Sequence, residues 1–131
     1  MSNLEEMIMK VLKKDKVYYE REKTFQDLRQ GKYRFDFYCP YAPGGPSVIE
    51  VQGPQHYYQI AKFHKTRQEF LSAKERDRRK INYCLGNGIR LYCIPYWDIK
   101  CISCADQIFS TKYRAVSQWK NDNDWKEFSK K

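Results

Sequence analysis

The chain has 131 residues, 41% of them hydrophobic and 31% charged, which fits one globular domain with a single core. Its formal charge of +9 favours a polyanionic partner, nucleic acid first and an acidic membrane second. No apolar stretch is long enough to span a membrane, and the first residues lack the pattern of a secretory signal. We therefore expect an intracellular protein with no membrane partner.

The first residues predict a helix that runs to about residue 13. Ser2 and Glu5 fit a capping box, and the apolar residues that follow recur at helical spacing. At about 100° per residue, Glu5 lies at the edge of the apolar stripe and Glu6 points away from it. Glu5 therefore either faces a site beside the core or serves only as a cap.

Two strands are predicted over residues 17–25 and 33–38, with a turn near residues 30–31. Alternation in the second strand places three aromatic residues on the core face: Tyr33, Phe35 and Phe37. Asp36 then lies on the other face, where Arg34 is also expected. An aspartate in the middle of a strand is disfavoured, so Asp36 either pairs with Arg34 at the surface or belongs to a site.

A third strand over residues 48–52 carries a carboxylate and an amide on one side. Alternation points Val48, Glu50 and Gln52 in the same direction. The Pro- and Gly-rich connector 40–46 makes a hairpin-like pair, so Asp36 and Glu50 are expected to be neighbours across strands. Two carboxylates with the main-chain carbonyl of Val51 form the hard oxygen set that Mg²⁺ prefers.

His56 follows the end of this strand closely. A neutral imidazole at the rim of a site has a suitable proton affinity near pH 7, which makes His56 the expected general base. The alternative is a rim histidine that bonds only to backbone.

A long helix is predicted over residues 61–84, and it is strongly basic. Between positions 62 and 80 there are eight basic residues against three acidic ones. Asp77 falls inside the apolar stripe of this helix, where a carboxylate must be paired or bind a metal. Lys80 lies at the edge of the stripe, where it either reaches the site or pairs with Asp77.

Residues 89–95 predict a further strand, and the order strand, long helix, strand implies a crossover with a parallel pair. A last helix is expected over residues 99–116. The fold class is therefore α/β, a mixed sheet of about four strands flanked by helices. We assign residues 1–117 to one domain and residues 118–131 to a polar C-terminal tail.

Five cysteines in an apparently unsecreted chain are expected to be reduced thiols. Cys101 and Cys104 have the spacing of zinc ligands, and Cys84 and Cys93 could complete a set of four. A zinc-dependent binding domain is therefore one alternative.

Several blocks, taken in order, resemble a known family. They are Arg34-Phe-Asp-Phe-Tyr38, Ile49-Glu-Val-Gln-Gly53, Gln55-His56-Tyr57, Arg76-Asp77 with Lys80, Tyr83 and Cys84, and Ile94-Pro-Tyr-Trp97. Together they resemble the PD-(D/E)XK nuclease superfamily, and within it the very-short-patch-repair-like and EDxHD homing-endonuclease-like proteins of phages, large viruses and bacteria. Gln52 stands where the family usually has Lys. The resemblance implies a restriction-endonuclease-like core and catalytic positions at Glu5, Asp36, His56 and Asp77.

These observations predict an Mg²⁺- or Mn²⁺-dependent endonuclease that hydrolyses phosphodiester bonds in DNA. The sequence does not assign an oligomeric state. The metal would be held by Asp36, Glu50, Val51 and Glu5, and the catalytic group would comprise Asp36, Glu50, Gln52, His56, Asp77 and Lys80. Lys80 would replace the missing strand lysine. The nucleic acid would contact Arg34, Tyr57, Tyr58, Arg67, Lys74, Arg76 and Arg79, with the tyrosines stacking on bases. The same residues also fit a branched-DNA (Holliday junction) resolvase or a catalytically inactive nucleic-acid-binding module.

Overall fold

Helix α1 (Asn3–Lys14) opens the chain and is fixed by its cap. The Ser2 hydroxyl accepts the backbone N–H of Glu5 at 3.1 Å, and the Glu5 carboxylate accepts the backbone N–H of Ser2 at 3.5 Å. This is the predicted capping box. Ile8 and Leu12 are fully buried. The computed structural model describes residues 2–54 and 66–115.

Four strands form one mixed sheet in the order β1-β2-β3-β4: β1 (Glu20–Thr24), β2 (Arg34–Cys39), β3 (Ser47–Gln52) and β4 (Arg90–Pro95). The first three strands are antiparallel, and β4 runs parallel to β3. Helix α2 (Arg67–Gly86) makes the crossover between β3 and β4. The predicted α/β class with a four-stranded mixed sheet is confirmed.

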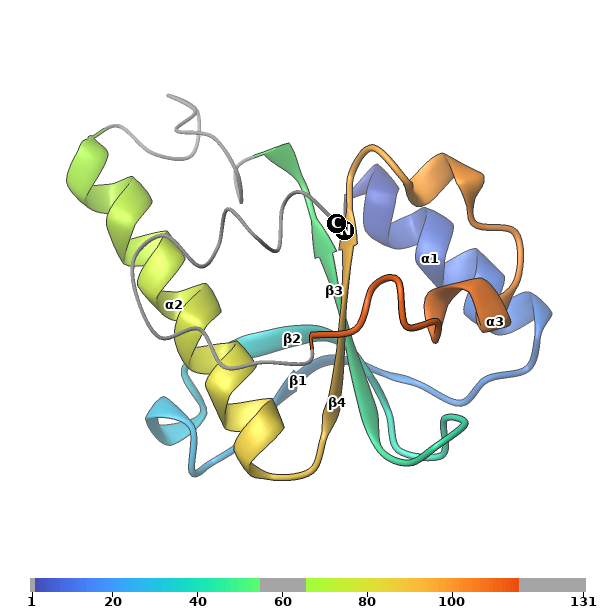
Figure 1. The fold of residues 1–131 in the computed structure, drawn as a ribbon, viewed down its shortest axis with the longest axis horizontal. Coiled ribbons are helices and arrows are strands. Elements are labelled where there is room, and N and C mark those ends of the chain that lie inside the picture. The colour runs from blue at the N-terminus through green and yellow to red at the C-terminus, as the bar shows by residue number, and fades with distance from the viewer. Residues whose placement is uncertain (1, 55–65, 116–131) are drawn as a thin grey trace.

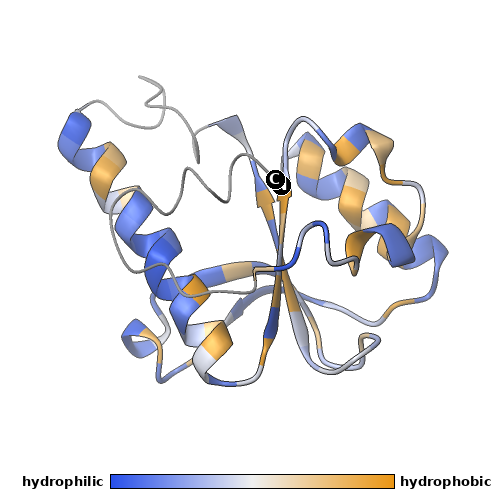
Figure 2. Cartoon of the chain, viewed as in Figure 1, coloured by the Kyte–Doolittle hydropathy of each residue, from blue (hydrophilic) through white to orange (hydrophobic). Residues whose placement is uncertain are grey.

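The helices cover both faces of the sheet, with α2 on one side and α1 with α3 (Ala105–Ile108) on the other (Figure 1). Ile49 and Tyr92 belong to the core cluster under α1, whereas Val48 and Leu91 belong to the cluster under α2. Hydrophobic residues mark α1 and the strands, and α2 is hydrophilic over most of its length (Figure 2). No helix in the described parts of the chain is long and apolar enough to cross a membrane.

The bounds of two predicted elements were wrong. The strand predicted over 17–25 is shorter, because Lys16 has a φ of 59° and the Val17 N–H bonds the Leu12 carbonyl at 2.9 Å, which keeps the chain at the helix end. Helix α2 begins at Arg67 because Thr66 is extended and its hydroxyl accepts the Glu69 N–H at 3.1 Å. Residues 61–65 lie outside the described residues.

The helix predicted over 99–116 was also wrong. A 3-10 turn η3 (Ile99–Cys101) and the short α3 replace it. Beyond α3 the chain returns to the edge of β4. There the backbone N–H of Cys93 donates to the Tyr113 carbonyl and the backbone N–H of Ala115 donates to the Leu91 carbonyl, each at 2.9 Å. These bonds satisfy polar backbone that a helix would leave open at the sheet edge. The predicted tail 118–131 lies outside the described residues.

Candidate functional site

Asp36 and Glu50 lie side by side across β2 and β3, as the hairpin-like pairing predicted. Asp36 accepts the Val51 N–H at 2.7 Å through Oδ2, and its carboxyl group also hydrogen-bonds the Glu50 side chain. Burial and the neighbouring Glu50 raise the pKa of Asp36 from 3.8 to about 9. Asp36 therefore keeps its proton at neutral pH. Val51 takes part through its amide, and the role predicted for its carbonyl stays a prediction.

The sheet is interrupted at Asp36. Regular β2–β3 pairing covers Phe37 to Cys39 and stops before Asp36, whose side chain takes the Val51 N–H instead. On the other side, Glu22 of β1 has a φ of 52° between two regularly paired residues. Such backbone strain is concentrated at functional sites. The prediction that Phe35 and Phe37 share one core face was wrong. The two rings lie on either side of the interruption and are buried in different core clusters.

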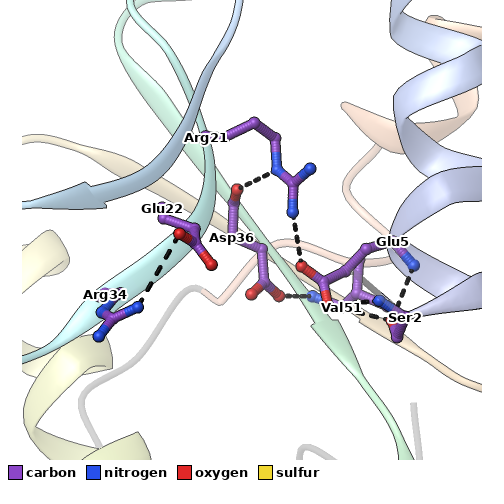
Figure 3. A network of polar contacts seen from close by, with 7 residues as sticks. All are labelled: Ser2, Glu5, Arg21, Glu22, Arg34, Asp36 and Val51. Atoms are coloured by element: carbon purple, nitrogen blue, oxygen red, sulfur yellow. Dashed lines mark hydrogen bonds and ion pairs between the residues drawn. The ribbon is translucent and has the colours of Figure 1, made fainter.

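Glu5 approaches the pair from α1 and is held by Arg21 (Figure 3). Arg21 Nη2 lies 2.9 Å from Glu5 Oε1, and Arg21 Nε donates to the Asp36 carbonyl at 3.3 Å. The guanidinium also lies 4.8 Å from the centre of the Phe37 ring. The negative charge of Glu5 contributes to the raised pKa of Asp36. Glu5 is therefore both the cap of α1 and a member of the acidic cluster.

Helix α2 supplies the cation of the site. Lys80 Nζ lies 2.5 Å from Glu50 Oε1, and the side chains are 12% and 9% exposed. Burial opposes the charge of Lys80, but Glu50, Asp77 and Asp36 together raise its pKa above the usual value. Lys80 is thus held as an ammonium ion. The alternative prediction, an ion pair between Lys80 and Asp77, was wrong, because Lys80 pairs with Glu50 instead.

Asp77 is paired instead with Lys74, whose Nζ lies 3.5 Å from Asp77 Oδ2. Lys74 is only 6% exposed, and burial lowers its pKa. Position 74 faces the sheet, so this lysine pairs with Asp77 rather than standing exposed on the helix. Its predicted contact with phosphate stays a prediction.

Cys93 on β4 lies close to these groups, on the α2 side of the sheet. It is paired with Glu50 in the parallel β3–β4 ladder. Burial raises the pKa of its thiol well above 9.0, and the nearby acids Glu50 and Asp77 raise it further. Cys93 is therefore a neutral, unreactive thiol beside the site.

The remaining site residues are placed as follows. Gln52 is half-buried at the end of β3, on the same side of the strand as Glu50. His56, Tyr57 and Tyr58 lie outside the described residues, so the predicted base and stacking rings stay predictions. The structure brings together Glu5, Asp36, Glu50, Asp77 and Lys80.

Of the predicted phosphate-binding residues, Arg67 and Arg76 are exposed on α2. Arg79 donates to Glu75 Oε1 at 3.0 Å and is half-exposed, and Arg34 lies 3.9 Å from Glu22 at the surface. The alternative prediction, a surface ion pair between Asp36 and Arg34, was therefore wrong, because Arg34 pairs with Glu22.

The four cysteines proposed as a zinc set lie apart. Cys84 and Cys93 are on the α2 side of the sheet, whereas Cys101 and Cys104 flank the segment that packs against α1. In residues 2–54 and 66–115, no three His, Cys, Asp or Glu side chains are close enough together to hold a metal ion. Asp36 and Glu50 offer the carboxylate oxygens that Mg²⁺ binds, and the predicted metal site stays a prediction.

Three participants were missed from the sequence: Arg21, Lys74 as the partner of Asp77, and Cys93. The available signal for Arg21 was a charged residue inside a predicted strand. No local pattern indicated that Arg21 reaches Glu5, sixteen residues away along the chain.

No family model and no solved structure matches the chain significantly. Uncharacterized protein 307L of Invertebrate iridescent virus 6 is 32% identical over 68 residues, which cover 52% of this chain and 34% of that protein. Uncharacterized protein 094L of Frog virus 3 is 40% identical over 57 residues, which cover 43% of this chain and 37% of that protein. The matches thus span about a third of the length of these curated relatives, both of which are proteins of large viruses.

Proposed function

We propose that this protein is a divalent-metal-dependent endonuclease that hydrolyses phosphodiester bonds in DNA inside the cell, and that it is of viral origin. The observation that carries the proposal is the buried Asp36–Glu50 pair at a break in the sheet, with the ammonium group of Lys80 2.5 Å from Glu50. Two carboxyl groups that cannot both ionise favour a cation beside them. The resemblance of the surrounding blocks to PD-(D/E)XK nucleases supports the same activity.

Asp36 and Glu50 would hold Mg²⁺ or Mn²⁺, which supplies positive charge to the phosphate oxygens and lowers the pKa of bound water. Asp36 would release its proton to solvent when a cation binds, so that both carboxylates would be available to hold it. Arg21 fixes the orientation of Glu5 toward this centre.

Lys80 has a specific task in this arrangement. Because its acidic neighbours raise its pKa, it stays protonated at neutral pH and acts as a hydrogen-bond donor, not as a base. From α2 it can donate to a phosphate oxygen or to the attacking water while it remains close to Glu50. Proton acceptance is left to His56.

The charge of the chain supports a nucleic-acid partner. The formal charge is +9, and exposed Arg67 and Arg76 lie on the same helix as Lys80. Such arginines bind phosphates without regard to sequence and concentrate the substrate near the site.

The test is cleavage of supercoiled plasmid and of single-stranded DNA, with and without Mg²⁺ or Mn²⁺. Wild-type protein should cut only with metal, and Asp36→Asn should reduce the rate by at least about a hundredfold. The matched control is Asp106→Asn, which removes an exposed carboxylate on α3 and should leave the rate unchanged. No metal-dependent scission, or equal scission by Asp36→Asn, would refute the proposal.

A further inference from the structure

The loop between β1 and β2 holds three consecutive residues in the left-handed backbone region. Arg29 has a φ of 49°, Gln30 of 55° and Gly31 of 75°. Residues with side chains rarely adopt this conformation, and the first two positions would be less strained as glycine. Strain of this kind persists where the surroundings enforce it, and it is concentrated at functional sites.

The inner side of the loop is firmly anchored. Phe25 packs its ring 5.7 Å from that of Phe35 and 5.4 Å from that of Tyr83 on α2. The Tyr83 hydroxyl donates to Asp27 at 2.5 Å, and Leu28 is 7% exposed. Backbone bonds close the turn from Gly31 N–H to the Leu28 carbonyl and from Lys32 N–H to the Arg29 carbonyl, each 3.1 Å. The loop is thus attached to both the sheet and α2.

The outer side of the loop carries exposed polar and charged side chains. Its exposed members are Gln26, Arg29, Gln30 and Lys32, with Asp27 beside them. Arg29 also lies 5.9 Å from the centre of the Tyr33 ring, which limits the directions of its guanidinium. Arginine pairs with guanine and glutamine with adenine through two hydrogen bonds at the major-groove edge of the base.

The position of the loop relative to the acidic centre is set by β2. The last regular β1–β2 pair is Thr24 with Arg34, and Asp36 lies two residues further along the strand, about 7 Å away. Successive base pairs of B-DNA are about 3.4 Å apart. Side chains on the loop would therefore reach bases within a few pairs of a phosphate held at Asp36.

We propose that this loop, residues 26–32, is the DNA-reading element, in which Arg29 and Gln30 contact base edges. The proposal rests on the proposed function, because it takes DNA as the substrate. The anchoring of the loop to the sheet and to α2 lowers the entropy lost when these exposed side chains bind.

The experiment selects bound sequences from a pool of randomised duplexes, using protein with Asp36→Asn so that binding is measured without cleavage. This protein should enrich a short sequence preference. Adding Arg29→Ala and Gln30→Ala should reduce the affinity ratio between the preferred and unrelated duplexes by about 5- to 150-fold for each base that the loop no longer reads. The comparison variant Arg76→Ala, on α2, should weaken binding to all duplexes alike.

A second variant separates recognition from folding. Gln30→Gly relieves the left-handed strain, so it should keep or raise the Tm while it reduces the base preference. Absence of any preference, the same preference after Arg29→Ala and Gln30→Ala, or a uniform loss of affinity with the preference intact would each overturn the inference. Absence of cleavage by wild-type protein would refute the nuclease instead and would leave this binding measurement valid.

Discussion

Replacement of Asp36 by Asn should make the folded protein more stable, and the gain should grow with pH. In the folded state, burial and Glu50 raise the pKa of Asp36 from 3.8 to about 9. Below pH 3.8 the group is protonated in both folded and unfolded chains, so its contribution is fully present there. As the pH rises from 3.8 towards about 9, the unfolded chain releases the proton that the folded chain keeps, and stability falls.

The size of this effect follows from the shift. One pKa unit corresponds to about 1.4 kcal/mol, so at pH 7 the proton held by Asp36 lowers the free energy of unfolding by up to about 4 kcal/mol relative to low pH. Asparagine resembles the protonated acid: its oxygen can accept the Val51 N–H and its amide can donate to Glu50. The variant therefore lacks the pH-dependent loss.

The assay is thermal unfolding of wild type and Asp36→Asn at pH 5 and pH 7, with Asp106→Asn as the control. The advantage of Asp36→Asn should widen by about 2.7 kcal/mol between these pH values, or roughly 10 °C in Tm. Mg²⁺ should raise the Tm of wild type and leave that of Asp36→Asn unchanged. An advantage that does not change with pH, or a variant less stable than wild type at both values, would show that folded Asp36 does not hold its proton at neutral pH.

Three further predictions concern the neighbours of the pair. Lys80→Ala leaves Glu50 buried without its cation and should destabilise the protein by about 3 kcal/mol in denaturant unfolding. Adding Glu50→Gln should restore much of that loss of stability. A double variant no more stable than Lys80→Ala would contradict the pairing. Glu5→Gln should weaken Mn²⁺ binding by calorimetry about tenfold, while Glu6→Gln on the opposite side of α1 should not; equal effects would show that Glu5 is only a cap. Lys74→Met should leave the salt dependence of DNA affinity unchanged, because Lys74 is buried, whereas a decrease of about one in the slope would place it on a phosphate.

Features set by local sequence were predictable. Ser2 and Glu5 define the start of α1 through contacts three residues apart, and alternation assigns Glu50 and Val51 to opposite faces of β3. The strand–helix–strand order also gives the parallel β3–β4 pair, since a crossover is required. The adjacency of Asp36 and Glu50 follows from these local patterns.

Features set by tertiary packing were not predictable. The rotation of α2 against the sheet decides that Lys80 meets Glu50 and that Lys74 meets Asp77, and the helical stripe alone allowed another pairing. The break at Asp36 arises because a side chain competes with backbone pairing, which no propensity scale describes. The segment after η3 likewise follows the unpaired edge of β4 rather than its own helical pattern.

The central claim is that Asp36 and Glu50 together hold a divalent cation. It is tested most directly by anomalous diffraction from a crystal soaked in Mn²⁺. One peak is expected between the two carboxylates, at about 2.0–2.3 Å from an oxygen of each, with Lys80 still within reach of Glu50. A crystal with no peak there, and with Asp36 still hydrogen-bonded to Glu50, would contradict it.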